Sequence, residues 1–126
     1  MLKETEKLLK AAGDRTRLRI LKMLEHGPLC VCQIVATLKL SQSTVSKHLS
    51  ILCASGLAED ESRGKWTFYR LAKPRAGEAR RLLSVVRCCA GEDPVVARDL
   101  SKVMGEKVRS LSRCCPPRRG IRKGGQ

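Results

Sequence analysis

Two short apolar periodicities, separated by a four-residue break, constrain the fold of this chain more than any other feature. The first periodicity recurs at positions i, i+3, i+4 and i+7 and predicts a helix that opens near Leu29 or Cys30. After the break at residues 39–42, Ser41 is expected to cap a second helix from Gln42 to Ala54. Two short helices joined by a tight turn are typical of a helix-turn-helix unit. The inward residues of the pair are Val31, Ile34, Val35, Leu38, Val45, Leu49 and Leu52.

The outward face of the second helix carries small polar and basic side chains. Such side chains solvate a free helix poorly but allow close approach to DNA, so we expect this helix to enter the major groove, although an ordinary helical hairpin would share the apolar pattern. Gln42 and Ser43 suit hydrogen bonds to base edges, whereas Lys47 suits phosphate. The predicted DNA contacts on this helix are Gln42, Ser43, Thr44, Ser46 and Lys47.

After Gly56 the apolar period changes from helical to alternating. Residues 57–61 and 66–71 predict two strands, joined by a turn at residues 62–65 in which Gly64 supplies a positive φ. Arg63 and Lys65 flank this glycine, so the tip of the hairpin is basic and suits DNA backbone or minor-groove contact. The sequence therefore predicts a mainly α fold with a β-hairpin wing, that is, a winged helix-turn-helix.

Further helices are predicted on both sides of this unit. Upstream, one runs over residues 2–12, and a second starts after Asp14 as N-cap and stops at Gly27. Downstream, residues 75–89 and 94–113 carry two more apolar stripes. A small domain closes its core without them, so we expect these terminal helices to pack against a second subunit, with packing inside the chain as the alternative. The expected organisation is one DNA-binding and dimerisation domain over residues 1–113 and a basic, disordered tail over residues 114–126.

The charge of the chain indicates its partner. Its 126 residues include 26 Lys and Arg against 12 Asp and Glu, which gives a net charge of +14, and nucleic acid is the first polyanion to consider. There is neither a signal-peptide pattern nor an apolar run of about 18 residues, so we expect a cytoplasmic protein. The sequence also lacks a Cys-x-x-Cys motif, a Ser/His/Asp set and a Gly-rich phosphate loop. These absences disfavour an enzyme, although a metal-buffering thiol protein would fit the cysteines.

The seven cysteines indicate a metal or redox function. Their number is odd, and close spacings such as Cys-x-Cys and Cys-Cys are unsuited to a structural disulfide framework. Soft thiolates favour As(III), Sb(III), Cd(II) or Cu(I), and a helix N-terminus lowers thiol pKa values. Cys30 and Cys32, at the start of the first helix of the pair, are therefore the leading metal ligands.

The other cysteines are weaker candidates. The adjacent residues Cys88 and Cys89 are either part of an apolar stripe or a second thiol site, and Cys53 is expected to fill the core. Cys114 and Cys115 border the tail, where thiols are reactive but weakly organised. An As(III) ion prefers three sulfur ligands, so a third donor is needed, and Cys53, a vicinal cysteine of either chain or a small cellular thiol are all open.

A thiol pair at this place suggests a switch. Residues i and i+2 of an ideal helix are separated by about 200° around the axis, so Cys30 and Cys32 would point to opposite sides. In an extended segment they would lie on one face. We therefore expect a shared ion to unwind the first helical turn and so to compete with DNA binding.

Three segments of the chain resemble the ArsR/SmtB family. They are residues 29–34 (Leu-Cys-Val-Cys-Gln-Ile), residues 41–49 (Ser-Gln-Ser-Thr-Val-Ser-Lys-His-Leu), and residues 64–66 with 69–71 (Gly-Lys-Trp and Tyr-Arg-Leu). The Cys-Val-Cys string is similar to that of the family's arsenite- and antimonite-responsive branch. Two positions depart from that branch, which usually has Asp where this chain has Gln33 and often a third cysteine where it has Val35.

The resemblance implies a homodimeric repressor that binds operator DNA without a cofactor and is released when As(III) or Sb(III) binds Cys30 and Cys32. It does not extend to the family's C-terminal zinc sites, because the two histidines, His26 and His48, lie far upstream. A repressor of the same fold whose thiols sense oxidants is the alternative.

Overall fold

The structure is a computed structural model that describes residues 2–64, 66–73, 77–88 and 93–109. Lys65, Cys89, Cys114 and Cys115 lie outside the described residues, as do the expected boundary at residue 113 and the expected tail. Within the described ranges, no helix combines the length and the apolar character that crossing a membrane requires.

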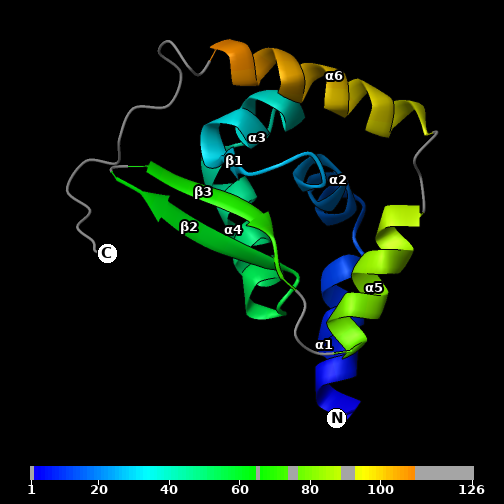
Figure 1. The fold of residues 1–126 in the computed structure, drawn as a ribbon. Coiled ribbons are helices and arrows are strands. Elements are labelled where there is room, and N and C mark those ends of the chain that lie inside the picture. Colours follow the sequence, from blue (N-terminus) through cyan, green and yellow to red (C-terminus); the bar gives the residue numbers. More distant parts are fainter. Residues whose placement is uncertain (1, 65, 74–76, 89–92, 110–126) are drawn as a thin grey trace.

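The described chain forms six helices and a small antiparallel sheet (Figure 1). This architecture confirms the predicted mainly α fold with a β-hairpin after the two short helices. Most element boundaries lie within two residues of the predicted ones. In chain order the elements are α1 (Leu2–Ala12), α2 (Arg15–Leu24), β1 (Leu29–Cys30), α3 (Val31–Leu38), α4 (Gln42–Ala54), β2 (Ala58–Arg63), β3 (Trp66–Leu71), α5 (Gly77–Cys88) and α6 (Pro94–Arg109).

The helix starts are capped as the sequence predicts. The Asp14 side chain accepts the backbone N–H of Arg17 at 3.0 Å, and this bond lowers the pKa of the Asp14 carboxyl. The Ser41 hydroxyl accepts the N–H of Thr44 at 3.2 Å at the start of α4. Between α3 and α4, Lys39 takes the left-handed conformation with φ 58° and donates its N–H to the carbonyl of Val35.

The strand β1 is a feature that the sequence did not reveal. Leu29 and Cys30 pair antiparallel with β3, opposite Tyr69 and Phe68, so the sheet has the order β1-β3-β2. The expected helix start at residue 29 or 30 is therefore wrong by one or two residues, because cross-strand hydrogen bonds with the hairpin keep these residues extended. This two-residue strand joins the wing directly to α3.

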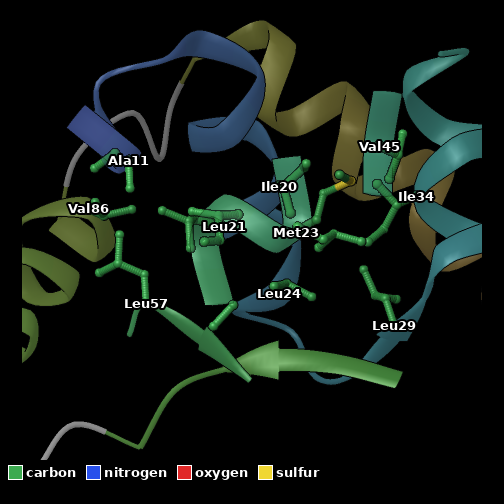
Figure 2. Packing of buried hydrophobic residues seen from close by; sticks show 14 of the residues in the cluster. Ala11, Ile20, Leu21, Met23, Leu24, Leu29, Ile34, Val45, Leu57 and Val86 are labelled. Atoms are coloured by element: carbon green, nitrogen blue, oxygen red, sulfur yellow. The ribbon is translucent and has the colours of Figure 1, made fainter. Parts of the chain in front are cut away.

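The core lies between α2, α3, α4 and the sheet (Figure 2). Ile20 and Met23 of α2 lie beside Ile34 of α3 and Val45 of α4 there, and all four side chains are nearly free of solvent contact. Leu18 of the same helix is 38% exposed, because α2 buries residues 20–24. The core therefore fixes the position of α4 relative to α3 and to the β2–β3 hairpin.

The terminal helices divide their apolar residues between the chain's own core and the surface. α6 lies across α2 and α3 (Figure 1) and buries Val103, which is 1% exposed. Asp99 of α6 accepts two bonds from the Arg19 guanidinium, both 2.8 Å long. Val103, from the apolar stripe predicted in residues 94–113, thus packs inside the chain rather than between subunits. Leu9 of α1 and Val85 of α5 remain exposed.

Candidate DNA interface and thiol pair

The helix α4 presents the predicted DNA-reading residues on its outer side. Gln42, Ser43 and Lys47 are exposed, and Thr44 and Ser46 are half-buried. The Ser41 hydroxyl lies 3.2 Å from that of Ser43 and donates to that of Thr44 at 2.8 Å, so both groups are oriented before DNA arrives. A buried inner face and an ordered polar outer face make α4 suitable for insertion into a major groove.

The wing is less free to bind phosphate than the sequence suggests. Arg63 donates to the Glu61 carboxylate at 2.9 Å, and its guanidinium lies 5.1 Å from the centre of the Phe68 ring. The Arg63 contact lowers the pKa of the Glu61 carboxyl, so this partner is charged at neutral pH. A phosphate must therefore compete with Glu61 for Arg63.

The thiol pair lies where β1 meets α3. Cys30 has extended backbone angles, φ −89° and ψ 163°, and is the N-cap residue of α3, whereas Cys32 is the second residue of the helix. Their Sγ atoms are 3.0 Å apart. Cys30 is buried and Cys32 is half-buried, so the pair is reached from the Cys32 side.

This geometry corrects the expected switch. The sequence predicted that both residues lie in the helix and point apart, so that a shared ion unwinds the first turn. That expectation is wrong, because Cys30 precedes the helix and its extended backbone already brings the two sulfur atoms together. Unwinding is unnecessary for both sulfurs to reach one ion.

Gln33 holds this junction in place. Its side-chain oxygen Oε1 accepts the backbone N–H of Cys30 at 2.8 Å, and Gln33 is itself buried. This is the reciprocal half of a capping box, in which the third helical residue reaches back to the N-cap residue. In the sequence, Gln33 stands out only as a departure from the aspartate of the arsenic branch, although a Gln three residues after an N-cap is a recognisable signal for this role.

The described cysteines elsewhere do not join the pair. Cys53 packs against the core, and burial, with smaller effects of Asp60 and Glu59, raises the pKa of its thiol to about 11. Cys88 is exposed at the end of α5, where Lys22 of α2 donates to the carbonyls of Val86 and Arg87. Among the described residues no three His, Cys, Asp or Glu side chains are grouped closely enough to hold a metal ion.

Comparison with known proteins identifies the family. A family model described as bacterial regulatory protein, arsR family, matches residues 14–60, which run from the cap of α2 into β2. The arsenical resistance operon repressor of Escherichia coli (strain K12) is 37% identical over 97 residues, covering 75% of this chain and 83% of the repressor. The chain belongs to the ArsR/SmtB family. The predicted resemblance, including its arsenic branch, is thereby confirmed.

Solved structures confirm the winged helix-turn-helix fold of this ArsR-family regulator. The homodimeric winged helix-turn-helix domain Mb0332 of Mycobacterium bovis, a possible ArsR-family regulator, matches with a TM-score of 0.61 and 29% identity, covering 74% of this chain and 83% of that chain. Reduced HlyU of Vibrio cholerae N16961 matches with a TM-score of 0.59 and 31% identity, covering 70% and 90%. The family and these neighbours are regulators of transcription.

One contact that the sequence did not indicate supports the recognition helix of this ArsR-family chain. The Arg17 guanidinium donates to the carbonyls of Ala11 and Lys10 at the end of α1, and it lies 3.2 Å from Nδ1 of His48 on α4. Arg17 therefore links α1 to the back of the DNA reader. No sequence pattern marks this role, because it depends on α1 and α4 meeting in space.

Proposed function

We propose that this ArsR-family regulator is a metalloid-responsive repressor, whose Cys30 and Cys32 thiolates bind As(III) or Sb(III) and thereby release operator DNA. The observation that carries the proposal is the 3.0 Å separation of the two Sγ atoms at the base of the helix that supports α4. Soft thiolates at a helix N-terminus suit a soft trivalent ion. The name of the Escherichia coli relative agrees with such an inducer.

The proposed repressor acts as a cytoplasmic homodimer and needs no cofactor to bind DNA. Gln42, Ser43, Thr44, Ser46 and Lys47 of α4 contact the major groove, and Arg63 and Lys65 of the wing contact the backbone or minor groove. The homodimeric Mycobacterium bovis neighbour and the exposed apolar residues of α1 and α5 support the dimer. Regulation is by binding rather than by catalysis.

The contacts of Cys30 and Cys32 explain how a bound ion would affect both elements that are proposed to contact DNA. Cys30 pairs with Phe68 of β3, and the Phe68 ring lies against Arg63 near the wing tip. Cys32 lies in the first turn of α3, which packs on α4. An ion that draws Cys30 and Cys32 into its own geometry therefore displaces β1 relative to α3, and with them the wing relative to the recognition helix.

A DNA-release titration tests this proposal. The protein is bound to DNA selected from a random pool, and arsenite or antimonite is added under reducing conditions. We expect release from the native protein and from Cys53→Ser, but not from a Cys30→Ser/Cys32→Ser variant. Normal release from the double variant would disprove the role of the pair.

A thiol redox sensor on the same fold is the second candidate. The close sulfur atoms favour it, since oxidation would shorten their separation to the roughly 2.05 Å of a disulfide bond. The similarity to HlyU, whose solved form is specified as reduced, points the same way. Release by peroxide, with no response to arsenite or antimonite in reduced protein, would select this candidate.

A further inference from the structure

We propose that the ligand matched to the Cys30–Cys32 site is a trivalent arsenical that carries one carbon substituent, R–As(OH)₂, rather than inorganic arsenite. This inference rests on the proposed function and specifies its ligand class. It follows from two features of the described site, namely the number of sulfur atoms that it brings together and the apolar residues beside them.

The site supplies two sulfur atoms in contact. With the two Sγ atoms 3.0 Å apart, one pyramidal arsenic atom can bind both sulfurs without unwinding α3. The Gln33 side chain fixes the extended conformation of Cys30 through its 2.8 Å bond to the Cys30 N–H. The two thiols are therefore already placed to bind one arsenic atom together, which lowers the entropy cost of ordering these side chains on binding.

The position where a third protein ligand would stand is apolar. Residues three and four apart are neighbours on a helix surface, so Val35 and Ala36 lie beside Cys32. Val35 is half-buried and packs against the core, and Ala36 is exposed. Neither side chain can bind arsenic, but both suit contact with a methyl or phenyl group.

The other described thiols do not fill this position. Cys53 is half-buried and packs against the core, and its pKa of about 11 leaves little thiolate at neutral pH. Cys88 stands at the end of α5, where Lys22 of α2 caps the carbonyls of the last turn. Within the described ranges the pair is not part of any group of three potential metal ligands.

The valence of arsenic then separates the two ligand classes. R–As(OH)₂ reacts with two thiols to give R–As(S-Cys)₂ and two waters: two As–S bonds form, two As–O bonds break, and each thiol proton leaves in water. Arsenic remains trivalent and no polar group is left on it. Arsenite, As(OH)₃, would keep one hydroxyl after the same exchange, and that hydroxyl would face Val35 without a sulfur to replace it, which costs free energy unless it is hydrogen-bonded.

Comparative titration of the DNA-bound, reduced full-length protein tests the inference. The probes are phenylarsine oxide, which hydrates to phenyl–As(OH)₂, and sodium arsenite. We expect phenylarsine oxide to release DNA at a concentration at least about tenfold below that of arsenite, a difference in binding of about 1.4 kcal/mol. Mass spectrometry should show one phenylarsenic group bridging Cys30 and Cys32.

A matched pair of variants isolates the third position. Val35→Cys adds a sulfur there and should lower the arsenite concentration needed for release by about tenfold or more, with little change for phenylarsine oxide. Val35→Thr has the same shape but no sulfur, and it should not improve the arsenite response. An equal gain from Val35→Thr would overturn the inference.

Two further results would overturn it while leaving the proposed function intact. One is arsenite acting at or below the phenylarsine oxide concentration in the native protein. The other is loss of an efficient arsenite response in Cys89→Ser or Cys114→Ser/Cys115→Ser, which would show that another cysteine completes a three-sulfur site. If the effects of both arsenicals persist in Cys30→Ser/Cys32→Ser, the proposed function itself fails.

Discussion

At the scale of single residues, the surroundings of each cysteine decide its chemistry. Cys30 and Cys32 lie at the N-terminus of α3, where the helix dipole is positive. Cys53 has the opposite environment, since it packs against the core and faces the carboxylates of Asp60 and Glu59. The same side chain is thus a proposed metal ligand at one site and a core-packing group at another.

This difference predicts the alkylation pattern. At pH 7.5 iodoacetamide should modify exposed Cys88 much faster than Cys53, because only the thiolate reacts and the pKa of Cys53 is raised to about 11. Peptide mass spectrometry at several reaction times measures both rates in one sample. Similar rates under native conditions would contradict the buried environment of Cys53, and denatured protein supplies the reference in which both should react.

The ion pair at the wing leads to a second prediction at this scale. Glu61→Gln should free Arg63 for phosphate, so DNA affinity should rise and the slope of log Kobs against log salt should become steeper by about 0.9, one phosphate contact. Glu59→Gln is the matched control. It removes one negative charge from the same strand, but its partner is Arg70, 2.9 Å away. A slope change of the same size in both variants would show that net charge, rather than release of Arg63, controls binding.

At the scale of the elements, a buried apolar side chain and an ion pair help to hold the helix α6 to α2 and α3. Asp99 is 2% exposed and accepts two bonds from Arg19, an interaction that also raises the pKa of the Arg19 guanidinium. Val103 lies one turn further along and is buried in the core cluster. Because α3 carries Cys32, α6 braces the helix in which the thiol site is built.

Asp99→Asn should therefore loosen α6. Breaking a buried pair leaves the second charge poorly compensated, and since Arg19 keeps some solvent contact we expect a loss of about 3 kcal/mol in the free energy of unfolding. Urea denaturation measures the loss, and hydrogen exchange should rise first in residues 94–109. Asp93→Ala is the comparison, because the exposed Asp93 side chain accepts the N–H of Val95 and the loss of this cap should cost about 1 kcal/mol. An equal loss in both variants would contradict the bracing role of Asp99.

At the scale of the whole molecule, an apolar groove and a strongly positive net charge accompany the candidate DNA-binding helix α4. The groove, of about 690 Å³, lies between α1, α2, α5 and α6 and includes exposed Leu9, Leu18 and Val85. Exposed apolar patches of this kind mark interaction sites. The proposed homodimer would cover these apolar residues. Each subunit carries a net charge of +14, so the dimer would present twice this charge to DNA.

Val85→Glu should accordingly weaken the dimer. Val85 is 56% exposed, so the folded monomer tolerates the charge, whereas an unpaired glutamate in an apolar interface does not. Sedimentation velocity should show a shift toward monomer with unchanged helical content. Met104→Glu is the matched control, since Met104 is similarly exposed on α6 but does not line the groove. Equal dissociation of both variants would place the interface elsewhere.

The sequence by itself determined the elements that depend on local physics. The apolar spacing of α3 and α4, the caps Asp14 and Ser41, and the alternation of the hairpin were all confirmed, because helical periodicity and capping act over a few neighbouring residues. The paired cysteines and the family followed from short motifs of the same kind.

Only the tertiary structure decided how distant segments meet. Pairing with β3 keeps Cys30 extended and thereby brings its sulfur atom close to that of Cys32. The packing of α6 on its own chain depends on the ion pair between Arg19 and Asp99, which are 80 residues apart in the sequence. Cross-strand hydrogen bonds and buried ion pairs need partners that are remote in sequence, so no local pattern reveals them. For that reason the thiol pair could be predicted, but its preformed geometry could not.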